Sequence, residues 1–165
     1  MIAVRTASAD ETRAVAEALA ALVGPGDVVL LSGDLGAGKT TFTQGLGRGL
    51  GIEARITSPT FTLAREYSGR VMLHHLDVYR LEQLAEVLDL GLPELLDSGG
   101  VVVVEWGDSI RPVLPADFLE VRLLFVDDGS DDERVFEFRG VGSSWSARGR
   151  ALAGALSSWT EGEPC

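Results

Sequence analysis

Gly33-Asp34-Leu35-Gly36-Ala37-Gly38-Lys39-Thr40 follows the apolar run Val28–Leu31 and precedes a segment with helical spacing. This octet fits the pattern G-x-x-x-x-G-K-[ST], whose backbone cradles nucleotide phosphates between a strand and a helix. Lys39 is the only lysine among the 165 residues. A lysine is a compact ammonium on a flexible stem, which can lie along β- and γ-phosphate oxygens. The stretch therefore predicts a buried parallel strand, a phosphate loop and a helix, in that order.

The remaining hydrophobic pattern predicts an α/β fold. We expect a P-loop NTPase-like three-layer sandwich, with a mixed, mostly parallel central sheet, helices on both faces and an antiparallel hairpin. Expected strands are Ile2–Thr6, Val28–Leu31, Thr60–Tyr67, Val71–Leu76, Val101–Val104, Phe118–Val126 and Arg134–Phe138. Expected helices run from the Ser8–Glu11 capping box to residues 24–26, from Lys39 to Leu50, over Leu81–Leu90 and Leu92–Leu96, and over Ser144–Trp159. Residues 1–159 are expected to form a single domain, followed by a loose tail at 160–165.

Composition and charge restrict the class of protein. No apolar run approaches the length of a membrane span, and the N-terminus lacks the features of a signal peptide. The single cysteine, Cys165, excludes a disulfide framework and a cysteine metal site, so we expect a cytoplasmic protein. The formal net charge of −11 disfavours autonomous nucleic-acid binding, because such binding depends on neutralising phosphates. An acidic surface suits solubility or docking to a protein partner.

A magnesium–nucleotide site needs oxygen ligands beside the phosphate loop. The hydroxyl of Thr40 is expected to bind Mg²⁺, as the last residue of the pattern does. Glu105 ends the strand Val101–Val104, and Asp77 follows the apolar end of the preceding predicted strand. Because the carboxyl ends of parallel strands meet at one edge of a sheet, either carboxylate could reach the metal. The structural alternatives are a solvated strand end for Glu105 and a helix N-cap for Asp77.

The absence of asparagine from the sequence narrows the choice of nucleotide. Small GTPases read guanine with an N-K-x-D motif, which this chain cannot form, so adenine is the better prediction. Two classes of nucleotide-binding protein stay open as alternative readings. One is a P-loop small-molecule or nucleoside kinase, and the other is a nucleotide-gated binding module without significant hydrolysis.

Four motifs together resemble the TsaE (YjeE) family of bacterial ATPases of tRNA threonylcarbamoyladenosine biosynthesis. They are GDLGAGKTT at 33–41, SPTFTL at 58–63, HLDVYRL at 75–81 and VEW at 104–106. The resemblance covers roughly residues 1–157. It implies an ATP- and Mg²⁺-dependent accessory subunit that assembles with TsaB and TsaD, whereas the threonylcarbamoyl transfer to adenosine 37 of tRNA belongs to TsaD. It also implies that hydrolysis resets the complex between turnovers. Because no arginine finger is identifiable from the sequence, we expect slow intrinsic turnover that changes when partners dock.

The resemblance assigns site residues to positions of this chain. Lys39 would contact the phosphates, Thr40 and Glu105 would hold Mg²⁺, and Asp77 would lie close by as a metal or water-orienting residue. The segment Ser58–Phe61 would form a switch-like loop near the γ-phosphate, with Thr60 as its contact. The phosphate cradle would consist of Asp34, Leu35, Gly36, Ala37, Gly38, Lys39, Thr40 and Thr41. The adenine would be held by Ser8 or Thr12 and by Arg134.

Overall fold

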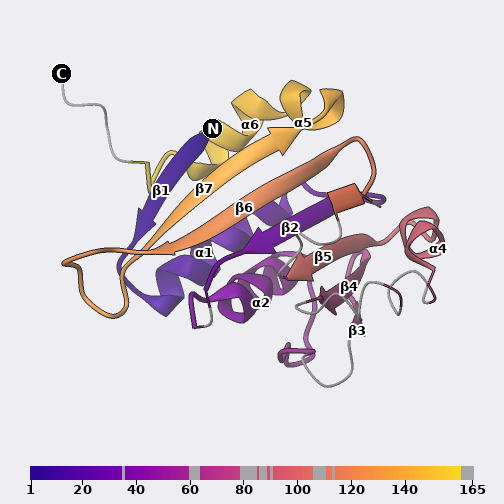
Figure 1. Ribbon diagram of the computed structural model, residues 1–165, viewed down its shortest axis with the longest axis horizontal. Coiled ribbons are helices and arrows are strands. Elements are labelled where there is room, and N and C mark those ends of the chain that lie inside the picture. Colours follow the sequence, from indigo (N-terminus) through magenta and orange to yellow (C-terminus); the bar gives the residue numbers. More distant parts are fainter. Residues whose placement is uncertain are drawn as a thin grey trace.

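The computed structural model describes residues 1–34, 36–59, 64–78, 85, 89, 91–105, 111–112 and 114–160 (Figure 1). Within these ranges, one sheet contains the strands β1 (Ile2–Thr6), β2 (Val28–Ser32), β3 (Ala64–Ser68), β4 (Met72–Asp77), β5 (Val101–Glu105), β6 (Phe118–Phe125) and β7 (Arg134–Val141). Their order across the sheet is β1-β7-β6-β2-β5-β4-β3. The order places β2, which leads into the phosphate loop, at the centre.

The four central strands β6, β2, β5 and β4 run parallel to one another. The outer pairings, β1 with β7, β7 with β6 and β3 with β4, are antiparallel. All residues of β5 and the first four of β2 are buried, which explains why these strands read as continuous apolar runs. The predicted mixed sheet, its edge strand Ile2–Thr6 and its antiparallel hairpin are confirmed.

Helices cover both faces of the sheet. Within the described residues, the labelled helices are α1 (Ala9–Ala20), α2 (Lys39–Gly49), α4 (Leu92–Asp97), α5 (Ser143–Ala147) and α6 (Gly149–Leu156). Side chains of α1, α2, α5 and α6 share one hydrophobic core with Val29 and Leu31 of β2. Leu92 of α4 packs into a second core with Val28 and Leu30, on the opposite face of the same strand. The three-layer arrangement is therefore confirmed.

The glycines of α2 allow it to approach α1 closely, and the two helices lie side by side in Figure 1. A Cβ on Gly45 would overlap backbone atoms of Arg13, and a Cβ on Gly49 would lie 2.9 Å from the carbonyl oxygen of Glu17. Close packing therefore explains glycines that are otherwise unfavourable in a helix. The contact fixes α2, and with it Lys39, against the rest of the fold.

Two local predictions have different outcomes. The Ser8 N-cap is confirmed, since its hydroxyl accepts from the Glu11 backbone N–H at 3.1 Å. The continuous helix Ser144–Trp159 is wrong, because the chain turns at Arg148 between α5 and α6. The Arg148 guanidinium pairs with both oxygens of Asp27, at 2.6 and 2.8 Å, and lies over the Trp145 ring. This anchor to the start of β2 holds the turn in place.

The other local predictions differ mainly at their ends. Helix α1 stops at Ala20, before the predicted stop at 24–26. The predicted helix Leu81–Leu90 and the end of the tail lie largely outside the described residues. Across the described part of the chain, no helix is long and apolar enough to cross a membrane.

Candidate functional site

The carboxyl ends of three neighbouring strands meet beside the phosphate loop. Leu31 of β2 lies opposite Glu105 of β5, and Glu105 lies opposite Asp77 of β4. Side chains alternate along a strand, and Leu31 belongs to the core on the α2 face. On β5, Val101 and Val103 belong to that same core, so Glu105 points to this face as well. The sheet therefore brings the two predicted carboxylates to the side on which α2 begins.

The loop between β2 and α2 uses glycine where its backbone turns sharply. Gly36 and Gly38 have φ angles of 81° and 107°, a region that disfavours residues with a Cβ. Gly38 is the N-cap of α2, so the loop passes directly into the helix. The first N–H groups of a helix lack intrahelical partners and carry the positive end of its dipole. The geometry is that of an anion-binding turn.

Arg134 braces this loop from β7. Its Nε donates to the carbonyl oxygen of Ala37 at 3.0 Å, and one terminal nitrogen donates to that of Gly36 at 3.3 Å. Because the C=O and N–H of a trans peptide point in opposite directions, the Gly38 N–H points away from Arg134. The guanidinium also lies 4.4 Å from the centroid of the Phe125 ring. Arg134 thus orients the loop backbone.

Lys39 is 6% exposed and folds back over the loop that precedes it. Its Nζ donates to the carbonyl oxygens of Gly33 and Asp34, at 2.6 and 3.2 Å. Burial lowers the pKa of the ammonium, while the carboxylates of Glu105, Asp77 and Asp34 act in the opposite direction. Burial and the nearby carboxylates therefore have opposite effects on the pKa of this lysine.

Glu105 connects the loop helix to a buried histidine. The hydroxyl of Thr40 lies 3.5 Å from Glu105 Oε1, and His75 Nε2 lies 3.0 Å from the same oxygen. Glu105 and Asp77 are 2% and 3% exposed, and His75 is fully buried. Burial excludes the solvated strand end considered for Glu105. The contact with Glu105 distinguishes His75 from its neighbour His74, which faces Glu66 and Ser98.

His75 was not predicted to take part in the site. A signal was available in the sequence, because residues two apart on a strand share a face and His75 stands two before Asp77. Adjacent residues of a strand face opposite sides of the sheet, so His74 contacts Glu66 whereas His75 contacts Glu105.

A small cavity of about 90 Å³ brings together most of the residues expected near the adenine. It is lined by Ala9, Thr12, Gly36, Ala37, Gly38, Thr41, Asp132 and Arg134. Thr12 is 3% exposed, and its hydroxyl lies 3.1 Å from that of Thr6. Ser8 does not line this cavity, since its hydroxyl caps α1. Thr12 is therefore better placed than Ser8 to face a group bound behind the loop.

Leu35 and Thr60 lie outside the described residues, so the geometry says nothing of these two predicted contacts.

The donor set at this edge suits a hard cation. Mg²⁺ prefers oxygen ligands and keeps several water and phosphate ligands, so one or two protein oxygens suffice. The Thr40 hydroxyl and the Glu105 carboxylate provide two such oxygens, with the Asp77 carboxylate on the adjacent strand. Among the described residues, no group of three or more His, Cys, Asp or Glu side chains forms a complete protein-only metal site. The residues therefore fit a metal that is shared with a phosphate ligand.

Comparison with known proteins agrees with this geometry. A family model described as "Threonylcarbamoyl adenosine biosynthesis protein TsaE" matches residues 6–134. The chain is 46% identical over 142 residues to the tRNA threonylcarbamoyladenosine biosynthesis protein TsaE of Bacillus subtilis, covering 86% of this chain and 87% of that protein. It is 44% identical over 128 residues to the protein of the same name from Treponema pallidum, covering 78% and 95%.

A solved structure is similar over nearly the whole chain. The crystal structure of Bacillus subtilis YdiB superposes with a TM-score of 0.75 at 40% sequence identity. The match covers 96% of this chain and 97% of the other. The likeness therefore extends over nearly the whole fold.

Proposed function

Because the chain belongs to the TsaE family, we propose that it binds ATP with Mg²⁺ at the shared edge of β2, β5 and β4. We further propose that it hydrolyses this ATP in support of N6-threonylcarbamoyladenosine formation in tRNA. The observation that carries the proposal is the pairing of three neighbouring strands, in which Leu31 lies opposite Glu105 and Glu105 lies opposite Asp77. This pairing brings two buried carboxylates to the side of the sheet on which α2 begins at Lys39. A glycine-rich turn with a purely structural role would not require two buried carboxylates beside it.

Each residue has a distinct part in this proposal. Lys39 leaves the carbonyl oxygens of Gly33 and Asp34 and pairs with the β- and γ-phosphates, since phosphate oxygens are stronger acceptors for an ammonium. The loop N–H groups, including that of Gly38, donate to the same phosphates. Thr40 and Glu105 would hold Mg²⁺, which would neutralise charge on the phosphates when bound. Asp77 orients the attacking water or shares the metal.

Hydrolysis is proposed to be slow in the isolated protein. Stabilising the charge on a transferring phosphoryl group often requires an arginine in addition to the lysine and the metal. Arg134 lies beside the loop, but its guanidinium donates to the backbone carbonyls of Gly36 and Ala37, behind the phosphate side. A docking partner that completes or rearranges the site would therefore change the rate of turnover.

The acidic charge is consistent with an accessory role. With a net charge of −11, the chain would meet tRNA only through its partners. We propose that these partners are the TsaB and TsaD proteins of the same pathway, in the cytoplasm. In this scheme ATP binding supports assembly, and hydrolysis resets the complex after each modification of adenosine 37 in tRNAs that read codons beginning with A.

Reconstitution of tRNA modification with TsaB and TsaD tests the proposal. Wild-type protein is expected to support repeated rounds of modification, whereas Lys39→Ala is expected to support a single round at most. A Gly154→Ala protein serves as the control, because an added Cβ there meets no atom within 4 Å. Normal repeated modification with Lys39→Ala would refute the proposed role of ATP.

A further inference from the structure

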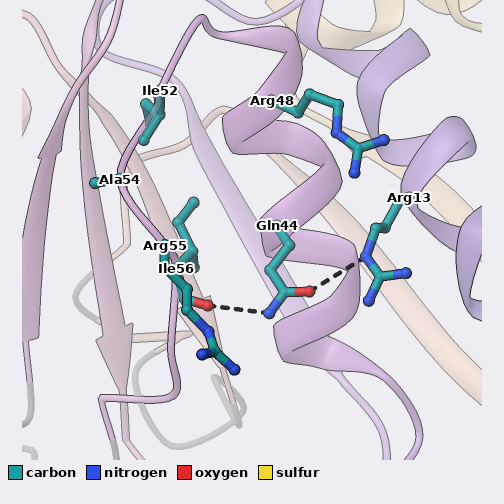
Figure 2. Close-up of a pocket in the computed structure, with 7 residues that line it drawn as sticks. All are labelled: Arg13, Gln44, Arg48, Ile52, Ala54, Arg55 and Ile56. Atoms are coloured by element: carbon teal, nitrogen blue, oxygen red, sulfur yellow. Dashed lines mark hydrogen bonds between the residues drawn. The ribbon is translucent and has the colours of Figure 1, made fainter.

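A groove of about 350 Å³ is lined by residues of α1, of α2 and of the segment that follows α2 (Figure 2). Three arginines line it: Arg13 from α1, Arg48 from α2 and Arg55 from the segment that follows α2. We call it the arginine groove. The chain has only 14 basic residues and a net charge of −11, so three guanidinium groups around one hollow are a local reversal of its charge.

Gln44 holds the two sides of the arginine groove together. Its side-chain oxygen accepts from Arg13 Nε at 3.3 Å, and its side-chain nitrogen donates to the carbonyl oxygen of Ile56 at 3.0 Å. Figure 2 shows this amide between the two partners, with the Arg55 guanidinium on the Ile56 side. The groove is therefore held by hydrogen bonds before any ligand arrives, which lowers the entropy cost of binding.

The charges of the arginine groove are only weakly neutralised within the chain. Arg13 pairs at 3.1 Å with Asp10, whose side chain is 93% exposed. Arg48 lies 3.9 Å from Glu17, and both side chains are about half exposed. No ion pair joins Arg55 to any residue in the described part of the chain. Exposed ion pairs of this kind contribute little to stability, so the carboxylate of a ligand can replace Asp10 or Glu17 at these arginines.

The shape and lining of the groove favour a protein ligand. The apolar residues Ile52, Ala54 and Ile56 also line the groove, and arginine together with apolar side chains is typical of protein interfaces. No described residue that lines the groove is aromatic, so it offers no surface on which bases could stack. The net charge of −11 disfavours a long polyanion such as RNA more than a short segment that carries a few carboxylates.

We propose that the arginine groove docks an acidic segment of a partner protein, whose Asp and Glu carboxylates pair with Arg13, Arg48 and Arg55. Planar guanidinium groups bind carboxylates through two parallel hydrogen bonds, which gives such a contact direction as well as attraction. The identity of the partner as a member of the tRNA-modifying complex rests on the proposed function, whereas the acidic chemistry does not. The groove is built on the helix that begins at Lys39, so the docked segment contacts an element of the nucleotide site.

Nuclear magnetic resonance titration of the full chain tests this docking. The probe is a short capped peptide of alternating glutamate and leucine, at an ionic strength of about 0.1 M, where the Debye length is about 10 Å. We expect it to shift the Nε–Hε signals of the three groove arginines and the side-chain amide signal of Gln44. The same peptide with glutamine in place of glutamate is expected to leave them unchanged.

Charge reversal identifies the residues responsible. The double variant R48E/R55E is expected to weaken peptide binding roughly tenfold. R139E/R150E changes the net charge equally at exposed positions that do not line the groove, and it is expected to weaken binding less than about twofold because salt screens distant charges. Should R48E/R55E fail to fold, R55E alone is used, since Arg55 lies in an exposed segment.

Three results would overturn the proposal. They are absence of shifts in the groove, equal losses of affinity in the two double variants, and binding of an oligouridylate of equal charge at least as tightly as the peptide. The last result would make the groove a nucleic-acid site. Failure of the proposed function is a separate outcome, because it appears as wild-type protein that does not support tRNA modification even though the peptide binds.

Discussion

Replacing Gly45 with alanine tests how strongly the close contact between α1 and α2 stabilises the fold that holds α2 in place. The added Cβ would lie 2.6 Å from Cα and 2.7 Å from the carbonyl carbon of Arg13, and closer still to its carbonyl oxygen. These are backbone atoms, so relief requires a shift of a whole helix. Overpacking typically costs about 1–3 kcal/mol, and contact with three backbone atoms places this site near the upper end.

The gain in helix propensity from glycine to alanine offsets about 1 kcal/mol of that cost. The free energy of unfolding should therefore fall by about 2 kcal/mol, which corresponds to a drop in Tm of about 4–8 °C for a chain of this size. Gly154→Ala in α6 is the matched control, because its Cβ meets nothing within 4 Å and only the propensity gain remains. Thermal and urea unfolding measure both variants. A Gly45→Ala protein as stable as Gly154→Ala would refute the reasoning.

Three further substitutions test the site. His75→Ala should lower the free energy of unfolding by about 1–3 kcal/mol, because it leaves the buried Glu105 carboxylate without the hydrogen bond to His75. Urea unfolding measures this loss. An unchanged unfolding midpoint would contradict the role of His75 in positioning Glu105. Arg134→Ala should weaken ATP binding roughly tenfold, because the carbonyl oxygens of Gly36 and Ala37 lose their guanidinium donor; calorimetry measures the affinity. Arg134→Lys should not restore the affinity, since lysine cannot donate to both carbonyls in the same geometry. Full affinity in Arg134→Lys would argue against the two-pronged guanidinium contact. Glu105→Ala should reduce phosphate release on the order of a hundredfold while ATP affinity changes little; undiminished release would exclude Glu105 from the reaction.

The elements that position the site could largely be predicted from local sequence. The run Val28–Leu31 followed by the glycine-rich loop determines a strand, a turn and a helix within a few residues of one another. The meeting of Asp77 and Glu105 was also predictable, because parallel strands place their carboxyl ends at one edge. Their exact partnership with Leu31 follows from the strand order, which no local pattern specifies.

Contacts between distant segments could not be predicted in this way. The turn at Arg148 depends on a salt bridge to Asp27, and helical periodicity carries no information about that pairing. The arginine groove combines α1, α2 and the segment after it, so it exists only once the two helices are packed. Gly45 and Gly49 of α2 pack closely against α1, and no local sequence pattern identifies that partner. Local sequence patterns therefore predict the individual helices and strands, whereas the contacts between them become known only from the packed structure.

The state of Lys39 tests the central claim most directly. Because the chain contains one lysine, labelling lysine with carbon-13 gives a single side-chain Cε signal whose pH titration reports the pKa of that ammonium. Burial should place the midpoint below that of an ordinary lysine in the protein alone. Saturating ATP with Mg²⁺ should raise the midpoint, since phosphate charge favours the protonated form. A Lys39 signal and midpoint that are unchanged by ATP under conditions where ATP binds would contradict the assignment of this loop as the phosphate site.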